Sequence, residues 1–170
     1  MDAGRLLIRQ ISPDETEVFR RIRLEALERE PASFASRHGD WVTLSDAEWR
    51  LRLNDPVFVA FNESEPVGVM GLLRSRPRKM AHRAVLVMVY IRKEFRGTGL
   101  AKALLERIAD FARVEGISQL ELGVSAENAG ALRFYNLNGF FEIGRVPGGF
   151  LDEGRCVDEV LMFKRLFLME

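Results

Sequence analysis

The stretch Ala84–Ala112 constrains the fold more than any other part of this chain. It begins with Ala84–Ile91, an unbroken apolar run rich in valine, which is typical of a strand buried on both faces. From Leu100 the apolar residues recur at helical spacing, and the loop between the two segments contains Gly97 and Gly99. A strand, a glycine loop and a helix in this order present the free N–H groups of a helix N-terminus. This arrangement favours the binding of a phosphate or pyrophosphate.

The spacing within the loop distinguishes between the known phosphate-binding motifs. A P-loop requires Gly-Lys-Ser/Thr, but Lys102 lies between two alanines. A dinucleotide fingerprint requires a third glycine at the position that Lys102 occupies. The pattern that fits is Arg-x-x-Gly-x-Ala, over Arg96–Ala101. The loop alone is equally compatible with an ordinary strand–turn–helix junction.

A second motif follows about thirty residues after the first. Gln119–Ser125 alternates apolar with polar or small residues, which predicts a strand. Asn128 is suited to cap a short helix that Gly139 ends. This segment reads Asn128-x-x-Ala131-x-x-x-Tyr135.

Together the two motifs resemble the signatures of the GNAT superfamily of N-acetyltransferases. The resemblance implies a single α/β domain over residues 1–170, with a mixed central sheet of about seven strands and about four helices. It also implies that the sheet is splayed between its fourth and fifth strands, where acetyl-CoA enters. The cofactor-binding residues that it implies are Val89, Ile91, Arg96, Gly97, Thr98, Gly99, Leu100, Ala101, Asn128 and Tyr135.

The resemblance also assigns chemical roles. The glycine loop would hold the pyrophosphate, and a backbone N–H around Val89–Ile91 would stabilise the thioester oxyanion. Tyr135 is the candidate for protonating the departing thiolate, because a phenol hydroxyl is a donor at neutral pH. Two structural alternatives remain: Tyr135 as a core aromatic, and Asn128 as a plain helix cap.

A general base is harder to identify. Family members often carry a glutamate on the strand before the glycine loop, but Ala84–Ile91 contains no carboxylate. Glu121 is the nearest catalytic candidate, with a solvent-facing strand residue as the alternative. Deprotonation through a water chain would need no dedicated carboxylate. Weaker candidates are Glu25, Asp158, Glu159 and His38.

Several further features have mainly structural interpretations. Phe34, Trp41 and Trp49 would either line the acceptor pocket or belong to the core. Cys156 is interpreted as a small buried hydrophobe. A run of basic residues is interpreted as a solvated loop; the alternative is that it binds the 3′-phosphate of the cofactor. The run contains Arg74, Arg76, Arg78, Lys79 and Arg83.

Local signals set the remaining boundaries. Ser12–Glu15 reads as a capping box, with Pro13 at the first position of a helix that runs to about Glu28. Near the other end, a strand over Phe140–Val146 is expected to stop at Pro147–Gly149, before a last strand at Val157–Leu166.

Composition limits the class of protein. Lys+Arg and Asp+Glu are both 25, so the balance gives no support for a nucleic-acid partner. One cysteine and no visible signal or spanning segment favour a cytoplasmic protein without a membrane partner. We therefore predict an acetyl-CoA-dependent, metal-free N-acetyltransferase acting on a small-molecule or peptide amine, with a homodimer left open. The alternative is a non-catalytic acyl-CoA-binding or regulatory domain.

Overall fold

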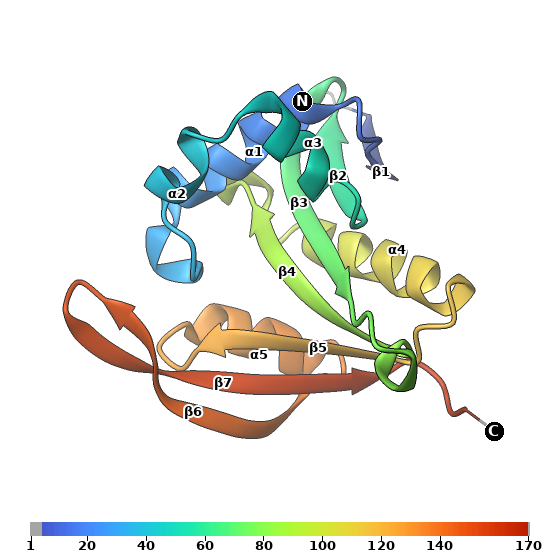
Figure 1. The fold of residues 1–170 in the computed structure, drawn as a ribbon, viewed down its shortest axis with the longest axis vertical. Helices are drawn as coiled ribbons and strands as arrows, with labels where there is room; N and C mark the ends of the chain where they lie inside the picture. Colours follow the sequence, from blue (N-terminus) through green and yellow to red (C-terminus); the bar gives the residue numbers. More distant parts are fainter. Residues whose placement is uncertain (1–4, 170) are drawn as a thin grey trace. The chain divides into compact units, whose positions relative to one another are not determined.

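The computed structural model describes residues 5–169, in which seven strands form a mixed sheet (Figure 1). The strand order is β1-β2-β3-β4-β5-β7-β6. β4 and β5 pair in parallel, whereas the pairs β1–β2, β2–β3, β5–β7 and β6–β7 are antiparallel. This confirms the predicted α/β class with its mixed sheet. In chain order the elements are β1 (Leu6–Gln10), α1 (Thr16–Arg29), α2 (His38–Val42), α3 (Asp46–Arg52), β2 (Val57–Asn62), β3 (Glu65–Arg74), β4 (Arg83–Ile91), α4 (Leu100–Val114), β5 (Gln119–Ser125), α5 (Ala129–Leu137), β6 (Phe141–Asp152) and β7 (Arg155–Arg165).

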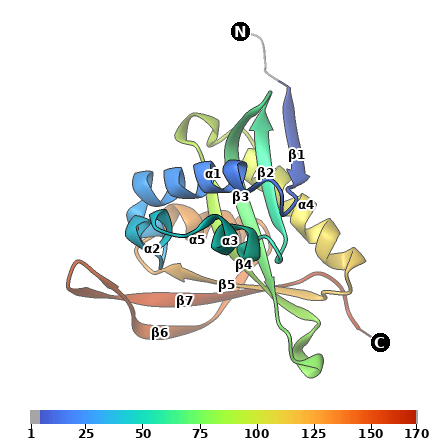
Figure 2. The ribbon, with the colours of Figure 1, turned by 45° about the horizontal axis from the view of Figure 1, so that its top comes forward.

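The described chain forms two compact units, and the first contains residues 5–73 and 86–112. Helices α1, α2 and α3 lie on one face of its strands, and α4 lies on the other (Figure 2). α1 turns Phe19, Ile22 and Ala26 inward at helical spacing, and all three are fully buried. They pack with Trp49 and Tyr90 in one hydrophobic cluster. This packing ties α1 and α3 to the sheet.

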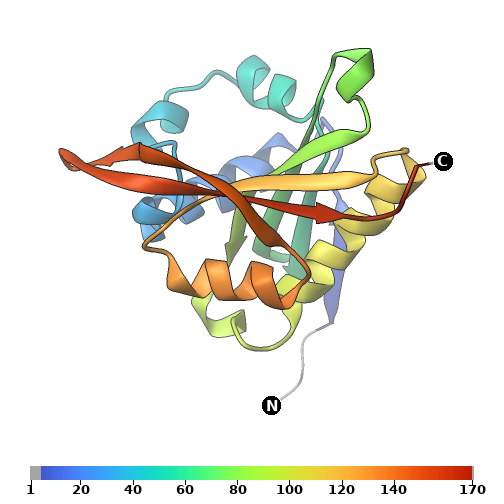
Figure 3. The ribbon, with the colours of Figure 1, turned by 90° about the horizontal axis from the view of Figure 1, so that it is seen from below.

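The second unit contains residues 74–85 and 113–169. Its strands β5, β7 and β6 form an antiparallel sheet, and α5 lies along one face of it (Figure 3). Phe140 follows α5 and packs its ring against Tyr135, with centroids 5.5 Å apart. The Lys164 ammonium of β7 lies over the same ring. These contacts fix α5 against β7.

The strand β4 runs through both units. Its pairing with β5 joins Arg83–Val85 to Gln119–Glu121. From Leu86 onward β4 belongs to the first unit, whereas β5 remains paired with β7 as far as Ser125. The pairing of β4 with β5 thus involves only the start of β4, and the splay between these strands stays a prediction.

Two predicted boundaries were wrong. α1 begins at Thr16, so Pro13 precedes the helix, and the Ser12 side chain caps nothing. Instead, Glu15 turns back to accept the Ser12 N–H at 2.7 Å. The second error lies in β6, which continues through Pro147–Gly149 to Asp152. A register shift between Val146 and Phe150 absorbs these residues as an irregularity of an edge strand, where proline is tolerated.

Candidate functional site

The glycine loop between β4 and α4 has the backbone conformation of an anion-binding turn. Gly97 and Gly99 have φ values of 75° and 86°, in the left-handed region that favours glycine. An added Cβ at either position would meet nothing within 4 Å, so the space beside the loop is open. Within residues 5–169, the N–H groups from Gly97 to Lys102 find no hydrogen-bond acceptor. A run of free N–H groups at the start of a long helix fits a pyrophosphate.

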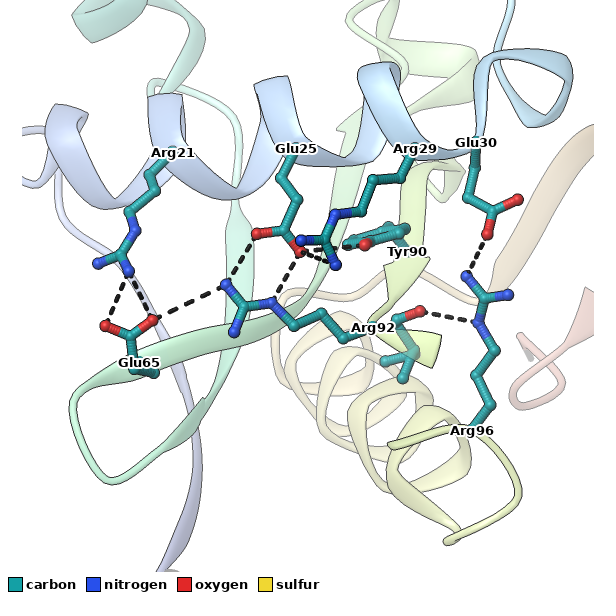
Figure 4. Close-up of polar contacts among 9 residues, drawn as sticks. Arg21, Glu25, Arg29, Glu30, Glu65, Tyr90, Arg92 and Arg96 are labelled. Carbon is teal, nitrogen blue, oxygen red and sulfur yellow. Dashed lines mark hydrogen bonds and ion pairs between the residues drawn. The ribbon is translucent and has the colours of Figure 1, made fainter. Parts of the chain in front are cut away.

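The side chains of the loop hold its shape. Arg96 donates from Nε to the Ile91 carbonyl at 2.9 Å, and from Nη2 to Glu30 at 2.6 Å (Figure 4). Thr98 Oγ1 donates to the Phe95 carbonyl at 2.6 Å. Arg96 therefore already has a carboxylate partner in this structure, and its visible contacts position the loop.

The end of β4 departs from regular strand geometry. Met88 has a φ of 56°, which is uncommon for a residue other than glycine. Gly71 faces it from β3, where an added Cβ would collide with the Met88 side chain. Gly68 similarly faces Ile91, with a Cβ expected 2.7 Å from Ile91 Cδ1. The two glycines thus make room for the irregular segment that includes Val89 and Ile91.

Glu25 of α1 is held in a polar network next to this segment (Figure 4). Arg92 donates to both of its carboxylate oxygens at 2.7 Å, and Tyr90 donates its hydroxyl at 3.0 Å. Burial, followed by the bond to Glu25, raises the pKa of Tyr90 to about 12. Glu25 was only a weak sequence candidate for the base, and nothing in the spacing of the sequence indicated this network.

Tyr135 lies on α5 and is 6% exposed. Its ring packs between Phe134 and Phe140, with centroid distances of 5.3 and 5.5 Å. Burial raises the pKa of its hydroxyl well above the ordinary value, so the group stays protonated at neutral pH. The hydroxyl has no hydrogen-bond partner among residues 5–169. It therefore remains available as a donor.

Asn128 acts as the cap of α5. Its Oδ1 accepts the Ala131 N–H at 3.2 Å, so the structural role considered for this residue is present. A second role at the cofactor, through its amide nitrogen, stays a prediction.

The carboxylate of Glu121, on β5, accepts hydrogen bonds from two side chains. Arg83 donates to both carboxylate oxygens, at 2.5 and 2.8 Å, and Gln119 donates at 2.9 Å. The bonds from Arg83 outweigh burial and hold the pKa of Glu121 below its usual range. This ion pair makes Glu121 a weaker base than an isolated carboxylate.

The remaining candidates from the sequence differ in burial and in the contacts that they make. Trp49 is fully buried, whereas Phe34 and Trp41 are half-buried at the edge of the same cluster. Asp158 accepts the Gly148 N–H at 2.9 Å, and Glu159 packs against Gly123 and Gly149. Cys156 is exposed, so its interpretation as a buried hydrophobe was wrong. It lies on β7 opposite Leu151 of the edge strand β6, which is itself exposed, so the start of β7 lies outside the core.

The predicted site residues fall in both units. The glycine loop, Val89 and Ile91 belong to the first unit, and Glu121, Asn128 and Tyr135 belong to the second. Residues 5–169 contain no cluster of three or more side chains suited to a metal ion. In the same range, every helix is too short or too polar to cross a bilayer.

Comparisons with known proteins agree on one family. Residues 19–140 match the model of the acetyltransferase (GNAT) family. Among curated proteins, the chain is 30% identical over 104 residues to an uncharacterised N-acetyltransferase of Methanocaldococcus jannaschii, covering 59% of this chain and 46% of that protein. It is 30% identical over 93 residues to the thialysine N-ε-acetyltransferase of Caenorhabditis elegans, covering 55% and 58%. The matched segments thus span about half the length of these relatives.

Solved structures share the fold over nearly the whole chain. A GNAT acetyltransferase from Streptococcus pneumoniae superposes with a TM-score of 0.82 at 26% identity, covering 95% of this chain and 99% of that one. A structure from Salmonella typhimurium, determined with its cofactor acetyl-CoA, gives 0.83 at 20% identity, covering 98% and 97%.

Proposed function

The chain belongs to the acetyltransferase (GNAT) family, and from that premise we propose that it transfers an acetyl group from acetyl-CoA to a primary amine of a small molecule or peptide. The observation that carries the proposal is the glycine loop. Its N–H groups from Gly97 to Lys102 lack acceptors at the start of α4, and no side chain fills the space beside Gly97 and Gly99. Backbone donors in this number suit the two phosphates of coenzyme A.

The cofactor would supply an activated thioester, and the chain's own residues would position it. Gly97–Ala101 would hold the pyrophosphate through backbone N–H groups, and Arg96 would keep the loop in shape. The backbone of Val89–Ile91 would offer an N–H to the developing oxyanion, at a place where Met88 already interrupts the strand. Asn128 would contact the cofactor while it caps α5.

Two proton transfers complete the reaction. The acceptor amine loses a proton, and the departing thiolate gains one. We assign the second step to Tyr135, because its hydroxyl is protonated and has no partner among residues 5–169, although the oxygen itself is not fully buried. The first step would use Glu121 or a water chain. The Arg83 pair lowers the basicity of Glu121, which favours the water chain.

The rival function is acyl-CoA binding without turnover. It shares the glycine loop with the enzyme, so cofactor binding alone does not distinguish the two. The Tyr135 hydroxyl is consistent with the enzyme, because it is protonated, is not fully buried and has no acceptor among residues 5–169, so it is free to donate to a bound thioester. The proposal is accordingly tested in two steps, binding first and thiol release second.

The binding step uses a matched pair of glycine variants. Gly99→Val forces a branched side chain to adopt a φ of 86° beside the proposed pyrophosphate site. Gly116→Val imposes the same kind of strain at a φ of 72°, between α4 and β5, and also has open space around it. We expect comparable losses of stability, but a large loss of acetyl-CoA affinity, measured by calorimetry, for Gly99→Val alone. Unchanged affinity in a folded Gly99→Val protein would contradict the site.

The catalytic step is thiol release from acetyl-CoA on a panel of primary amines. Amine-dependent release supports transfer. Tight acetyl-CoA binding without release on any amine would support the non-catalytic rival. Locating the acetyl group on the amine by mass spectrometry separates transfer from simple thioester hydrolysis.

A further inference from the structure

Arg23 of α1 is a buried charge without a polar partner. The residue is 3% exposed, and its Nε and Nη1 atoms are fully buried without a hydrogen-bond acceptor. Within residues 5–169, Trp49 Nε1 is the one other fully buried side-chain nitrogen or oxygen that lacks a hydrogen-bond partner. The third guanidinium nitrogen, Nη2, is not fully buried. An unpaired buried charge is costly, so a protein that keeps one has a use for it, or the charge meets its partner from outside.

The other arginines of the same helix all have carboxylate partners. Arg20 pairs with Glu17 and Asp46, Arg21 pairs with Glu65, and Arg29 lies 3.9 Å from Glu25. The carboxylates that these arginines engage are Glu17, Asp46, Glu65 and Glu25, and none of the four is paired with Arg23. Among the arginines of α1, Arg23 is the buried one, and it is also the one without a carboxylate partner.

Aromatic rings hold this guanidinium in place. Its Cζ lies 4.5 Å from the Trp41 ring centroid and 4.9 Å from that of Phe34. Arg52 of α3 also approaches the Trp41 ring, at 4.9 Å, so two positive charges gather on one indole. Cation–π contacts orient a guanidinium but leave its N–H groups unsatisfied. The result is an oriented cation whose N–H groups lack acceptors and of which only Nη2 is not fully buried.

The rings that hold this cation border the same hydrophobic cluster as the irregular part of β4. Phe34, Trp41 and Met88 are all half-buried, and all three pack against this cluster, which also includes Tyr90.

We propose that Arg23 binds a carboxylate of the acceptor, so that the amine accepted by this protein is an amino acid or a related amino carboxylic acid. The inference rests on the proposed transferase function and names its substrate class. A carboxylate fits this cation, because Nη2 is the guanidinium nitrogen that is not fully buried and can donate to an anion. Burial also lowers the pKa of Arg23 to about 10, which leaves the side chain charged at neutral pH.

The test compares acceptors that differ only at the carboxylate. The panel contains L-amino acids, the corresponding amino acid amides, and aminophosphonic acids as a second kind of anion. With wild-type protein we expect acids to exceed their amides in kcat/KM by roughly 10- to 100-fold, the scale of one charge-assisted interaction. Aminophosphonic acids as the preferred class would overturn the carboxylate in favour of a phosphonate.

Variants then assign the preference to Arg23. Arg23→Met retains much of the apolar stem and removes the charge, so we expect the KM for acids to rise while the kinetics with amides and the affinity for acetyl-CoA stay within about threefold. Because an unpaired buried charge is replaced by an apolar group, the melting temperature should not fall. Arg23→Lys should restore part of the preference. Arg21→Met, at an exposed and paired arginine of the same helix, is the matched control and should leave the preference intact.

The outcomes separate the inference from the function on which it rests. Amides or polyamines used as well as amino acids, or an acid preference that survives Arg23→Met, would overturn the role of Arg23 while leaving the transferase standing. Lack of thiol release with every amine, despite acetyl-CoA binding, would overturn the transferase and the inference with it.

Discussion

The Arg92 guanidinium donates two hydrogen bonds of 2.7 Å to the Glu25 carboxylate, and so ties the residue after β4 to α1 (Figure 4). Tyr90 adds a third donor to the same carboxylate. Glu65 then contacts Arg92 at 3.8 Å and pairs with Arg21, which extends the network along the helix. The network fixes β4 next to the segment proposed to hold the thioester.

This pairing predicts how stability depends on pH. Burial pushes the pKa of Glu25 up, but the bonds from Arg92 and Tyr90 outweigh it, and the net direction is down. A carboxyl whose pKa is lowered on folding stabilises the protein above its ordinary value of 4.5. That contribution is lost as the pH falls through the lower pKa of the folded state. Glu25→Gln should therefore cost about 1–3 kcal/mol at pH 7, and the difference from wild type should shrink below about pH 4.

Urea unfolding at a series of pH values measures this difference. Glu17→Gln is the matched control, because Glu17 also pairs with an arginine of α1 but its side chain is 80% exposed. Its cost should be at most about 1 kcal/mol at any pH. Equal costs for the two variants would contradict a special role for Glu25.

The packing of β3 against the irregular part of β4 gives a second prediction. An added Cβ at Gly71 collides with the Met88 side chain and comes 3.1 Å from Val87 Cγ2. The nearest atom is the terminal Cε of the flexible Met88 side chain, which can shift, so Gly71→Ala should destabilise the protein by about 0.5–1.5 kcal/mol. Combined with Met88→Ala, which removes the obstacle, the cost should be less than the sum of the single variants by at least about 0.5 kcal/mol.

The control for this cycle is Gly39→Ala in α2. No atom lies within 4 Å of its expected Cβ, and its backbone has no positive φ. Alanine there should be neutral or stabilising by up to about 1 kcal/mol. Strict additivity of Gly71→Ala and Met88→Ala would show that the two residues do not share the space.

The sequence predicted best where the signal was local. Apolar spacing located β4 and α4, because helix and strand periods differ within a single segment. Glycine pairs that require positive φ located the loop at Gly97 and Gly99. Predictions failed where a residue outside the local segment decided the outcome. β7 holds β6 through Pro147–Gly149, and Arg9 shares the Glu15 carboxylate at the start of α1.

The same limit applies to the candidate site. The Glu25–Arg92 bond joins residues that are 67 positions apart, and Arg23 is recognisable as a buried cation without a hydrogen-bond partner only in the folded chain. The spacing of residues in the sequence predicts neither feature. Asn128 and Tyr135 could be proposed from the sequence because their motif is compact and covers one short helix and its cap.

The proton acceptor is tested through the Arg83–Glu121 pair. The bonds from Arg83 hold the pKa of Glu121 low, so Arg83→Met should raise that pKa. If Glu121 accepts the proton of the amine, the acid limb of kcat/KM must then move to higher pH, since a larger fraction is protonated at each acidic pH. An acid limb that does not move would remove Glu121 as the base and leave the water chain. Arg155→Met, which breaks an exposed pair with Glu127, is the control and should not shift the profile.

The two tyrosines of the chain provide the last prediction, because their hydroxyl groups are in opposite situations. Tyr90 donates to the Glu25 carboxylate, whereas Tyr135 has no partner among residues 5–169. Tyr90→Phe should therefore lose about 1.5–3 kcal/mol of stability, the usual value of a hydrogen bond to a charged group. Tyr135→Phe should change stability by less than about 1 kcal/mol, because it removes no bond within the described chain.

Turnover should show the reverse order. If Tyr135 protonates the departing thiolate, its hydroxyl matters only as charge develops on sulfur. Tyr135→Phe should then lower kcat by roughly 10²-fold or more while acetyl-CoA affinity stays nearly unchanged, since the loss is confined to the transition state. Tyr90→Phe should reduce kcat per folded molecule much less. Wild-type turnover by a folded Tyr135→Phe protein would reject the general-acid role, and it would leave the glycine loop untouched, because the binding of pyrophosphate depends on other residues.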